Sequence, residues 1–541
     1  MSDVAIAQAH QLEPISAIAE RAGVPEDALI PFGKTKAKID VAKLPERSQG
    51  KLVLVTGISP TPAGEGKSTV LIGLADALSQ RGKKTVVALR EPSLGPVMGI
   101  KGGAAGGGYS QVVPMEDINL HFTGDFHAIT SATNTLATIL DNHIHQGNKL
   151  NIDPRRITWK RCLDVNDRSL RRVITGLGGP ASGTPQEAGF TITAASEIMA
   201  VLCLSRDLAD FKERVARIVV AQTYNQEPVT AGDLGAAGAL TALMRDALNP
   251  NLVQTLGGTP AIVHGGPFAN IAHGCNSLIA TRTALNLGDV VVTEAGFGSD
   301  LGAEKFFDIK CRFSGLEPAA AVIVATIRSL KHNGGGNLTD GLVNLERHVG
   351  NIRGFGIDPV VALNAFTADT DAERAEMAQW AKDHDVTLID ADVWAKGGEG
   401  GLELADAVMS RIDSGEANFA PIYDPADGIE ASLQTVATKV YGAERVELSD
   451  AAHKDLAFLE AHGWDKLPVC ISKTQYSFSD DPKTLGAPTG HTLHVRQLIP
   501  RIGAGFVVAL TGAVMEMPGL GKTPAAYNID VDQSGAITGL F

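Results

Sequence analysis

The chain of 541 residues has only five cysteines and no long apolar run. No segment approaches the roughly 18 uninterrupted apolar residues of a membrane-spanning helix, so we expect no membrane partner. The N-terminus lacks the basic-then-apolar pattern of a secretory signal, which favours a cytoplasmic location. The cysteines are widely spaced, without a CxxC motif or Cys/His cluster. We therefore expect buried free thiols, with neither disulfides nor a zinc site, at Cys162, Cys203, Cys275, Cys311 and Cys470.

Positive charge is also scarce. The 47 lysines and arginines face 61 aspartates and glutamates, a formal net charge of −14. Such a chain is a poor partner for nucleic acid, and local cations and helix N-termini would have to attract any anionic substrate. The one basic concentration, residues 153–172, includes Asp164 and Asp167. It indicates a solvated, ion-paired face or a subunit contact more than a site for a polyanionic substrate tail.

Glycine is in excess. The 59 glycines cluster in loops, which is typical of backbone that lies close to a ligand. The length exceeds one ordinary core, and the composition is that of a globular protein. We expect a catalytic domain over residues 1–360, a second α/β domain over 361–480 that supplies a ring pocket, and a small β-rich domain over 481–541. Pro359 and the turn at 354–356 mark the first boundary.

From Lys51 onward, short runs that are apolar throughout alternate with amphipathic stretches. Such runs are typical of strands covered on both faces of a parallel sheet, so the fold class is α/β. The polar and glycine-rich loops after these strands should converge on one crevice, because ligands of open α/β sheets bind at the carboxyl ends of strands. We expect strands at 51–56, 85–89, 261–264, 290–293, 320–325 and 360–363, and helices at 68–80, 206–220 and 373–384, after a helix-rich lead-in over 1–50.

The stretch from Val53 to Thr69 predicts a phosphate site. A strand leads into a Gly/Pro loop that ends Gly-Lys-Ser, and an amphipathic helix follows. In such a loop the backbone N–H groups cradle phosphates, Lys67 reaches the terminal phosphate and Ser68 binds Mg²⁺. The consensus has glycine where this chain has Thr61, and a plain tight turn is the alternative. We expect a P-loop NTPase-like domain that binds ATP through Thr61, Pro62, Ala63, Gly64, Glu65, Gly66, Lys67 and Ser68.

A second segment, Gly519-Leu-Gly-Lys522-Thr523, superficially repeats this pattern after the apolar run 506–509. Pro524 follows at once, and residues 527–532 alternate as a strand would. Without a helix N-terminus the backbone offers no anion site of this kind. We therefore expect no second nucleotide loop there.

Several further residues follow predicted strands. Arg90 ends the strand at 85–89, and its planar fork fits two oxygens of a phosphate or carboxylate, although a surface ion pair is the alternative. The glycine run Gly99–Tyr109 indicates backbone pressed against a ligand, or a flexible linker. Asp125 could bind Mg²⁺ or hold a reacting amine, and His121 and His127 could act as acid/base groups. Structural roles stay open for these three.

Two aromatic residues lie on other loops after strands. Phe366 follows the strand at 360–363, and Trp394 precedes the glycine loop 397–401. Two such rings could sandwich a flat heterocycle such as adenine or a pterin, with core packing as the alternative. Glu294 and the segment 324–335 also follow strands and point to the same crevice without naming a reaction.

Segments 61–68, 99–109 and 324–335 resemble the signatures of the formate–tetrahydrofolate ligase family, and the similarity runs essentially from end to end. The resemblance implies that ATP, formate and tetrahydrofolate give 10-formyltetrahydrofolate, ADP and phosphate through formyl phosphate. It also implies Mg²⁺, a monovalent cation activator (K⁺ or NH₄⁺), small-molecule partners and a cytoplasmic homotetramer. Lys67, Ser68 and Arg90 would then hold the transferred phosphoryl group, and Asp125 would orient the amine or accept its proton. The ring clamp would be Phe366 and Trp394.

Two other classes remain as alternatives. One is a different ATP-dependent carboxylate-activating ligase of the P-loop fold, such as a dethiobiotin-synthetase-like enzyme, which should lack the glycine run and the Phe/Trp pair. The other is a partitioning ATPase with a deviant phosphate loop. That class has a second lysine where this chain has Pro62, which argues against it.

Overall fold

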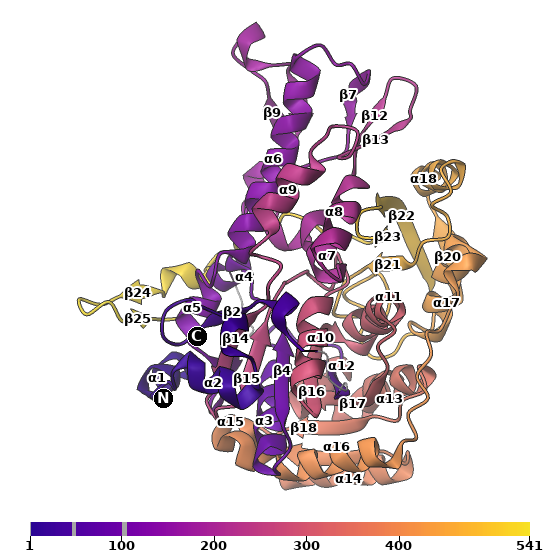
Figure 1. The fold of residues 1–541 in the computed structure, drawn as a ribbon. Helices are drawn as coiled ribbons and strands as arrows, with labels where there is room; N and C mark the ends of the chain where they lie inside the picture. Colours follow the sequence, from indigo (N-terminus) through magenta and orange to yellow (C-terminus); the bar gives the residue numbers. More distant parts are fainter. Residues whose placement is uncertain (1, 46–49, 100–104, 541) are drawn as a thin grey trace.

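The computed structural model describes residues 2–45, 50–99 and 105–540. Its centre is a 12-stranded sheet (Figure 1). The strands follow the order β1 (Leu29–Pro31), β2 (Ala37–Ile39), β14 (Asn251–Thr255), β15 (Pro260–Val263), β4 (Thr85–Leu89), β16 (Val290–Gly298), β3 (Lys51–Gly57), β17 (Pro318–Ala325), β18 (Val360–Asn364) and β19 (Thr387–Ala391). The short strands β5 (Gly106–Gly107) and β6 (Ser110–Val113) join it beside β14.

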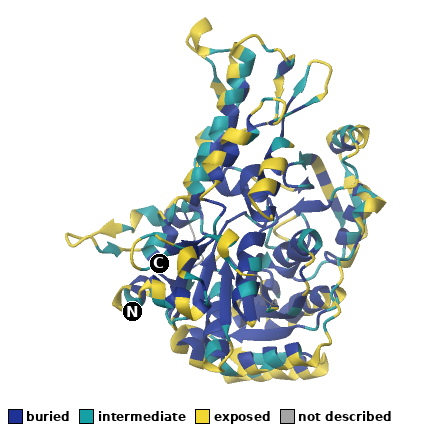
Figure 2. Ribbon diagram, in the orientation of Figure 1, coloured by how far each residue is buried: buried dark blue, intermediate teal, exposed yellow. Residues whose placement is uncertain are grey.

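The seven strands from β15 to β19 run parallel, and antiparallel strands extend the β15 edge. Along β3, Val53 and Val55 belong to the core on one face, whereas Leu52 and Leu54 belong to the core on the other. Figure 2 shows the central strands of the sheet buried, whereas β1 and β19 at its two edges are partly exposed. Most positions of the central parallel strands are apolar because both faces are covered, as the sequence predicted.

Helices cover both faces of this sheet. Residues of α3 (Lys67–Gln80) and α16 (Leu402–Ser414) pack into one core. The opposite core takes side chains from α2 (Ile15–Ala22), α10 (Leu278–Leu287), α12 (Ile327–Asn333), α13 (Leu338–Gly354) and α14 (Asp371–Asp383). This sandwich holds the carboxyl ends of the central strands rigidly at one edge, where ligands of such folds bind.

Two further parts extend from the sheet (Figure 1). One, at the top of the view, contains α6 (Asp125–His145), α7 (Glu197–Leu204), α8 (Leu208–Ala216), α9 (Ala237–Met244), β7 (Ile152–Ile157), β12 (Val219–Thr223) and β13 (Pro228–Thr230). The other is a four-stranded sheet with two helices, made of β20 (Arg445–Leu448), β22 (Thr492–Arg501), β23 (Phe506–Thr511), β21 (Val469–Ser472), α17 (Ile429–Lys439) and α18 (Asp450–Ala461). A hairpin of β24 (Asp530–Val531) and β25 (Ile537–Thr538) protrudes near the C-terminus.

Shorter elements connect these parts. They are α1 (Asp3–Ala9), α4 (Leu94–Met98), α5 (Met115–Asn119), α11 (Arg312–Ser314), α15 (Val393–Lys396), β8 (Arg161–Cys162), β9 (Val173–Thr175), β10 (Gln186–Ala188) and β11 (Phe190–Thr191). Within the described ranges, no helix combines the length and apolarity needed to cross a bilayer. All five cysteines are buried and free, which confirms the prediction for the thiols.

The α/β class and the mostly parallel sheet are confirmed. The prediction of a helix over 206–220 is wrong at its end: α8 stops at Ala216, and the branched pair Val219–Val220 enters β12. The lead-in over 1–50 contains α1 and α2, as a helix-rich segment should, and it also contributes β2, which pairs with β14 and extends the sheet. As expected, no long helix follows Lys522: the short 3₁₀ turn Ala525–Tyr527 leads to β24.

The sheets run across both predicted domain boundaries. β18 and β19 lie in the central sheet although they follow residue 359, and β18 pairs with β17 from Val360 to Leu363. The C-terminal sheet likewise combines β20 and β21 with β22 and β23, on either side of residue 480. The division at 360 and 480 stays a prediction about domains. Each sheet extends beyond one predicted domain because strand pairing joins segments that are remote in sequence.

Candidate active site

The loop between β3 and α3 closes tightly before the helix begins. Gly64 and Gly66 have φ angles of 78° and 69°, in the left-handed region that favours glycine. A Cβ atom at Gly66 would lie 2.4 Å from Asn364 Nδ2, and this Nδ2 donates a hydrogen bond to the Glu65 carbonyl over 3.1 Å. The backbone therefore presents a tight turn at the N-terminus of a long helix, the arrangement that binds phosphates.

The buried carboxylate of Glu65 explains the departure at Thr61. Glu65 Oε1 accepts hydrogen bonds from the Thr61 backbone N–H and from Thr61 Oγ1, each over 2.7 Å. Its Oε2 accepts a hydrogen bond from Thr326 Oγ1, at the N-cap of α12. Glycine at position 61 could make only the backbone contact. The threonine thus supplies a side-chain hydrogen bond that closes this loop.

Replacing Thr61 by valine should weaken the site without unfolding the chain. Valine keeps the shape but removes one hydrogen bond to a charged acceptor, a contribution of roughly 1.5–3 kcal/mol. We expect the KM for ATP to rise about ten-fold, at about 1.4 kcal/mol for each factor of ten. Thr61→Ser retains the hydroxyl and should keep a nearly normal KM. Equal KM values for the two variants would contradict this role of the hydroxyl.

Glu294 lies at the centre of the crevice. It is fully buried on β16, between β3 and β4. Lys67 Nζ forms an ion pair with Glu294 Oε2, and Ser68 Oγ donates a hydrogen bond to the same oxygen over 2.9 Å. Arg90 Nε donates to Oε1 over 3.4 Å. The structure therefore brings together the predicted residues Lys67, Ser68 and Arg90. All three contact Glu294, to which the sequence assigned no role.

The electrostatics of this centre favour a further anion. Burial by itself would raise the pKa of Glu294, but the charges of Lys67 and Arg90 outweigh it and hold the pKa at about 2. Burial lowers the pKa of Lys67, and the nearby Arg90 lowers it further, whereas Glu294 raises it. Glu294 is therefore ionised at neutral pH, and two cations face one carboxylate. The excess positive charge lies where the loop amides and the start of α3 also point.

Asp125 occupies a neighbouring buried position at the start of α6. Lys38 Nζ donates to its Oδ1 and Asn251 Nδ2 to its Oδ2, each over 2.7 Å. Glu91, which follows Arg90 in the chain, is buried near this group. Burial first, and then the charge of Asp125, raises the pKa of Glu91 well above its usual value. The two carboxyl groups thus lie next to the strand end that carries Arg90, whereas the predicted role of Asp125 stays a prediction.

Phe366 and Trp394 both lie exposed near the phosphate loop. The guanidinium of Arg328 packs over the Phe366 ring, with its Cζ 5.0 Å from the ring centroid. The Trp394 carbonyl accepts a hydrogen bond from Tyr109 N–H over 2.9 Å. Their exposed fractions, 38% and 48%, contradict the core-packing alternative. In the described part of the chain, no ring contact joins the two residues, so any flat ligand would lie between separate rings.

The glycine run also contacts this region. Residues 100–104 of the run lie outside the described residues. Within the described remainder, a Cβ at Gly108 would lie 2.1 Å from the Trp394 carbonyl oxygen. The backbone at Gly108 therefore packs directly on α15, as an ordered loop. His121 and His127 are both exposed, and their roles stay open.

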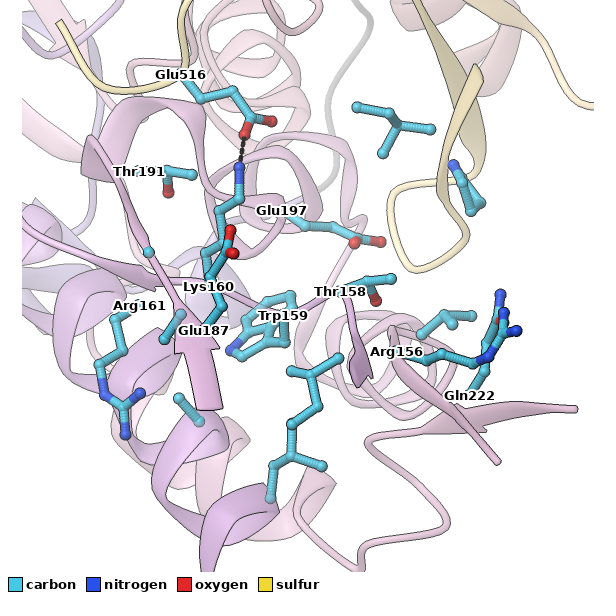
Figure 3. Close-up of a pocket in the computed structure, with 18 of the residues that line it drawn as sticks. Arg156, Thr158, Trp159, Lys160, Arg161, Glu187, Thr191, Glu197, Gln222 and Glu516 are labelled. Carbon is cyan, nitrogen blue, oxygen red and sulfur yellow. Dashed lines mark hydrogen bonds and ion pairs between the residues drawn. The ribbon is translucent and has the colours of Figure 1, made fainter. Parts of the chain in front are cut away.

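A groove of about 1420 Å³ lies apart from this crevice and contains much of the basic segment (Figure 3). Trp159 lines the groove, and Lys160 forms an ion pair with Glu516 over 2.7 Å. Arg161 pairs with Asp141 at the same distance. These contacts confirm that residues 153–172 form a partly ion-paired face. The phosphate loop does not line this groove.

The sequence matches a known family over its entire length. The model of the family described as formate–tetrahydrofolate ligase matches residues 1–541. This chain belongs to the formate–tetrahydrofolate ligase family. Proteins named formate–tetrahydrofolate ligase from Corynebacterium jeikeium and Corynebacterium diphtheriae are each 69% identical to it, over all of this chain and 98% and 100% of their own lengths. The protein of that name from Staphylococcus aureus is 57% identical over both full chains.

Sequence reasoning did not anticipate three residues of this candidate site. Glu294 was noted only because it follows a strand, and its contacts with Lys67 and Arg90 had no local signal. Lys38 carried no signal, because it lies in the lead-in, far from Asp125 in the chain. Arg328 lay within a recognised segment but had no assigned partner. Its contact with Phe366 depends on the packing of α12 beside the end of β18.

Proposed function

We propose that this member of the formate–tetrahydrofolate ligase family ligates formate to tetrahydrofolate with ATP, giving 10-formyltetrahydrofolate, ADP and phosphate. The observation that supports it best is the convergence of Lys67, Ser68 and Arg90 on Glu294. In this proposal the Glu294 carboxylate holds the place of a substrate anion, and the excess positive charge of Lys67 and Arg90 suits a phosphoryl group. In this proposal residues 61–68 form the phosphate loop of a P-loop NTPase-like domain, and the enzyme is a cytoplasmic homotetramer.

The first step of the proposed reaction requires neutralisation of charge. A formate oxygen attacks the γ-phosphorus of ATP, the bond to the bridging oxygen breaks, and formyl phosphate and ADP form. Phosphoryl transfer of this kind depends on positioning and electrostatic stabilisation more than on covalent help from protein. Lys67 and Arg90 would stabilise the oxygens of the transferred group, with the planar fork of Arg90 suited to two of them.

Residues of the crevice also fit a Mg²⁺ ion. Ser68 Oγ and Glu294 Oε2 are oxygen ligands 2.9 Å apart, and Mg²⁺ prefers oxygens and bridges phosphates. When bound with ATP, the ion would neutralise phosphate charge. Such a role would draw Glu294 from Lys67 and free the lysine for the phosphate. A monovalent cation activator, K⁺ or NH₄⁺, belongs to the proposal without assigned ligands.

The second step transfers the formyl group. The amine N10 of tetrahydrofolate attacks the formyl carbon, inorganic phosphate leaves, and the amine loses a proton. Asp125 is our candidate for orienting the amine or accepting that proton, although Lys38 and Asn251 hold both of its oxygens. Ordering of Asp125 by these two partners suits orientation better than proton transfer.

Trp394→Ala should chiefly weaken binding of tetrahydrofolate. The indole is half-exposed and supplies a flat face for the pterin, whereas its backbone contact with Tyr109 survives the substitution. We expect the KM for tetrahydrofolate to rise about ten-fold, equivalent to about 1.4 kcal/mol, with little change in kcat. Trp394→Phe keeps an aromatic face and should lose less. Unchanged Michaelis constants in both variants would exclude the clamp.

One assay tests the proposed function against the alternatives. ADP release by the purified chain should require both formate and tetrahydrofolate, in addition to ATP and Mg²⁺. A different carboxylate-activating ligase would show no dependence on formate. A partitioning ATPase would release ADP without either substrate. Absence of formate dependence would refute the proposed function.

A further inference from the structure

Lys310 is a fully buried cation in the helical segment that follows β16. It belongs to Phe306–Cys311, whose π-type hydrogen bonding is rare in proteins and frequent at functional sites. Its Nζ donates to the Asn276 carbonyl over 2.9 Å, to Asn276 Oδ1 over 2.7 Å and to Thr281 Oγ1 over 2.7 Å. An ammonium group has three N–H donors. All three are therefore used, two of them on Asn276.

The two residues before Asn276 hold the backbone that follows Glu294. Cys275 forms an antiparallel bridge with Ala295, which is the next residue after Glu294. The carbonyl of Gly274 accepts a hydrogen bond from the N–H of the following residue of β16, over 3.0 Å. The position of Asn276 therefore bears directly on the position of the Glu294 carboxylate in the crevice.

Asn276 also contacts the residue that precedes Glu294. Thr293 Oγ1 donates to the Ala88 carbonyl over 2.8 Å and to Asn276 Oδ1 over 3.3 Å. Ala88 lies in β4, two residues before Arg90. One asparagine thus contributes to holding the strand on both sides of Glu294, and the same contacts reach the strand that leads into Arg90.

The charge of Lys310 has no acidic partner in the described part of the chain. The titratable groups that face it are the thiols of Cys275, Cys311 and Cys203 and the ring of His273. Burial raises the pKa of all three thiols and lowers the pKa of His273 to about 3, so these four groups are neutral at pH 7. Burial also lowers the pKa of Lys310, to about 8. The ammonium is therefore charged at neutral pH and loses its proton under mildly alkaline conditions.

We infer that Lys310 is a positioning residue for phosphoryl transfer: its ammonium group fixes Asn276 and thereby the backbone that carries Glu294. The inference rests on the proposed function, because it takes the crevice around Glu294 as the place of that transfer. Lys310 acts through Asn276 and not on the reacting atoms. A neutral amine has only two N–H donors, so one of its three hydrogen bonds is lost or reversed when the proton leaves. Deprotonation should therefore loosen Asn276 and displace Glu294.

Lys310→Met tests the role of the ammonium group. Methionine retains an unbranched apolar side chain and removes the three hydrogen bonds to Asn276 and Thr281. We expect kcat to fall by about 10–10²-fold, since a displacement of about 1 Å in an active site can cost 10²-fold. The KM for ATP should change little, because the phosphate loop keeps its own contacts. Steady-state ADP release with formate and tetrahydrofolate measures both constants.

The pH profile of kcat/KM for ATP separates positioning from packing, because this ratio reports the pKa values of the free enzyme. In the unmodified chain it should fall on the alkaline side with a pKa of about 8, and in Lys310→Met this fall should be absent. Asn276→Asp places a carboxylate beside the ammonium, in place of an amide whose Nδ2 has no hydrogen-bond partner among the described residues. The fall should then move to higher pH by at least about one unit. A fall that stays at the same pH in both variants would belong to another group, such as Lys67, and would overturn the inference.

Ile309→Ala is the matched control for damage to the same segment. Ile309 precedes Lys310, is fully buried and packs into the apolar core that also contains residues of α7 and α9. The cavity should lower the thermal midpoint. The alkaline fall in kcat/KM should nevertheless remain at a pKa of about 8, because Lys310 keeps its three partners. Loss of the fall in Ile309→Ala would show that any disturbance of the segment abolishes it, and would refute the assignment to Lys310.

The outcomes distinguish this inference from the proposed function. Formate-dependent turnover with one unchanged pH profile in all the variants would support the proposed function and refute the positioning role. ADP release that needs no formate, yet responds to Lys310→Met and Asn276→Asp as described, would refute the proposed function and support the positioning role, with water as the phosphoryl acceptor. If the unmodified chain does not turn over ATP under any of these conditions, both fail together.

Discussion

Arg90→Ala should abolish formyl transfer while ATP and ADP still bind. Arg90 directly follows β4, its Nε donates to Glu294 Oε1, and its Nη1 donates to the Pro267 carbonyl over 3.4 Å. Its ion pair is therefore with Glu294 in the crevice, in place of the surface pair with Glu91 that was the alternative. An arginine that stabilises charge on a transferring phosphoryl group contributes roughly 10³–10⁵-fold to the rate. We expect kcat to fall by at least about 10³-fold.

Binding and turnover measurements together test this prediction. The Kd of ATP should rise only a few-fold, because the loop amides and Lys67 still bind the phosphates. Arg90→Lys restores the charge as a point without the planar fork and should recover only a small part of the rate. Arg81→Met, at the opposite end of α3, serves as the matched control. Near-normal turnover of Arg90→Ala would exclude a role in transfer, and loss of ATP binding would indicate a role in nucleotide affinity instead.

Glu294→Gln should produce the second large effect, on both stability and activity. The glutamine preserves the shape but leaves Lys67 and Arg90 without their common anion. Removing one partner of a buried ion pair costs roughly 3–5 kcal/mol, and the partial exposure of Lys67 and Arg90 reduces this to about 2–3 kcal/mol. We expect lower thermal stability and a fall of about 10²–10³-fold in kcat, the range for a single electrostatic contributor.

The effect of added phosphate on thermal stability provides a control for the Glu294→Gln prediction. In Glu294→Gln the two cations should bind inorganic phosphate more tightly than in the unmodified chain, because the anion replaces the missing carboxylate. Phosphate should therefore raise the thermal midpoint of the variant more than that of the unmodified chain. Glu516→Gln removes an acid that pairs with Lys160 and Arg501 at the separate groove, and should show no such rescue. Equal responses to phosphate in both variants would contradict the stand-in role of Glu294.

Local patterns in the sequence predicted much of the fold. Apolar runs located β3, β4, β17 and β18 to within a few residues. The reason is that a strand covered on both faces carries apolar side chains on both. The Gly-Lys-Ser loop before an amphipathic stretch likewise located α3. The local pattern was misleading at Val219–Val220, which we predicted as the end of a helix. In the structure these residues belong to β12, which pairs with β7 and β13.

The residues in local motifs of the candidate site were predictable, and their distant partners were not. Lys67, Ser68 and Arg90 stand in local motifs, so their residue types and spacing indicated phosphate chemistry. Their partner Glu294 lies 227 residues from Lys67, and no local pattern reports a contact at that separation. The same holds for Lys38 and Asp125, which are 87 residues apart.

The sequence alone determined the α/β class, the tight Gly-Lys-Ser loop before α3 and the resemblance to the ligase family, since each is carried by residues close together in the chain. Only the tertiary structure decided why Thr61 replaces a glycine, which carboxylate gathers the cations, and that β18 and β19 belong to the central sheet. Each of these depends on which distant segments pack together. The physical reason is that burial and turn preferences are local properties, whereas ion-pair partners and strand neighbours depend on how segments remote in the chain pack together.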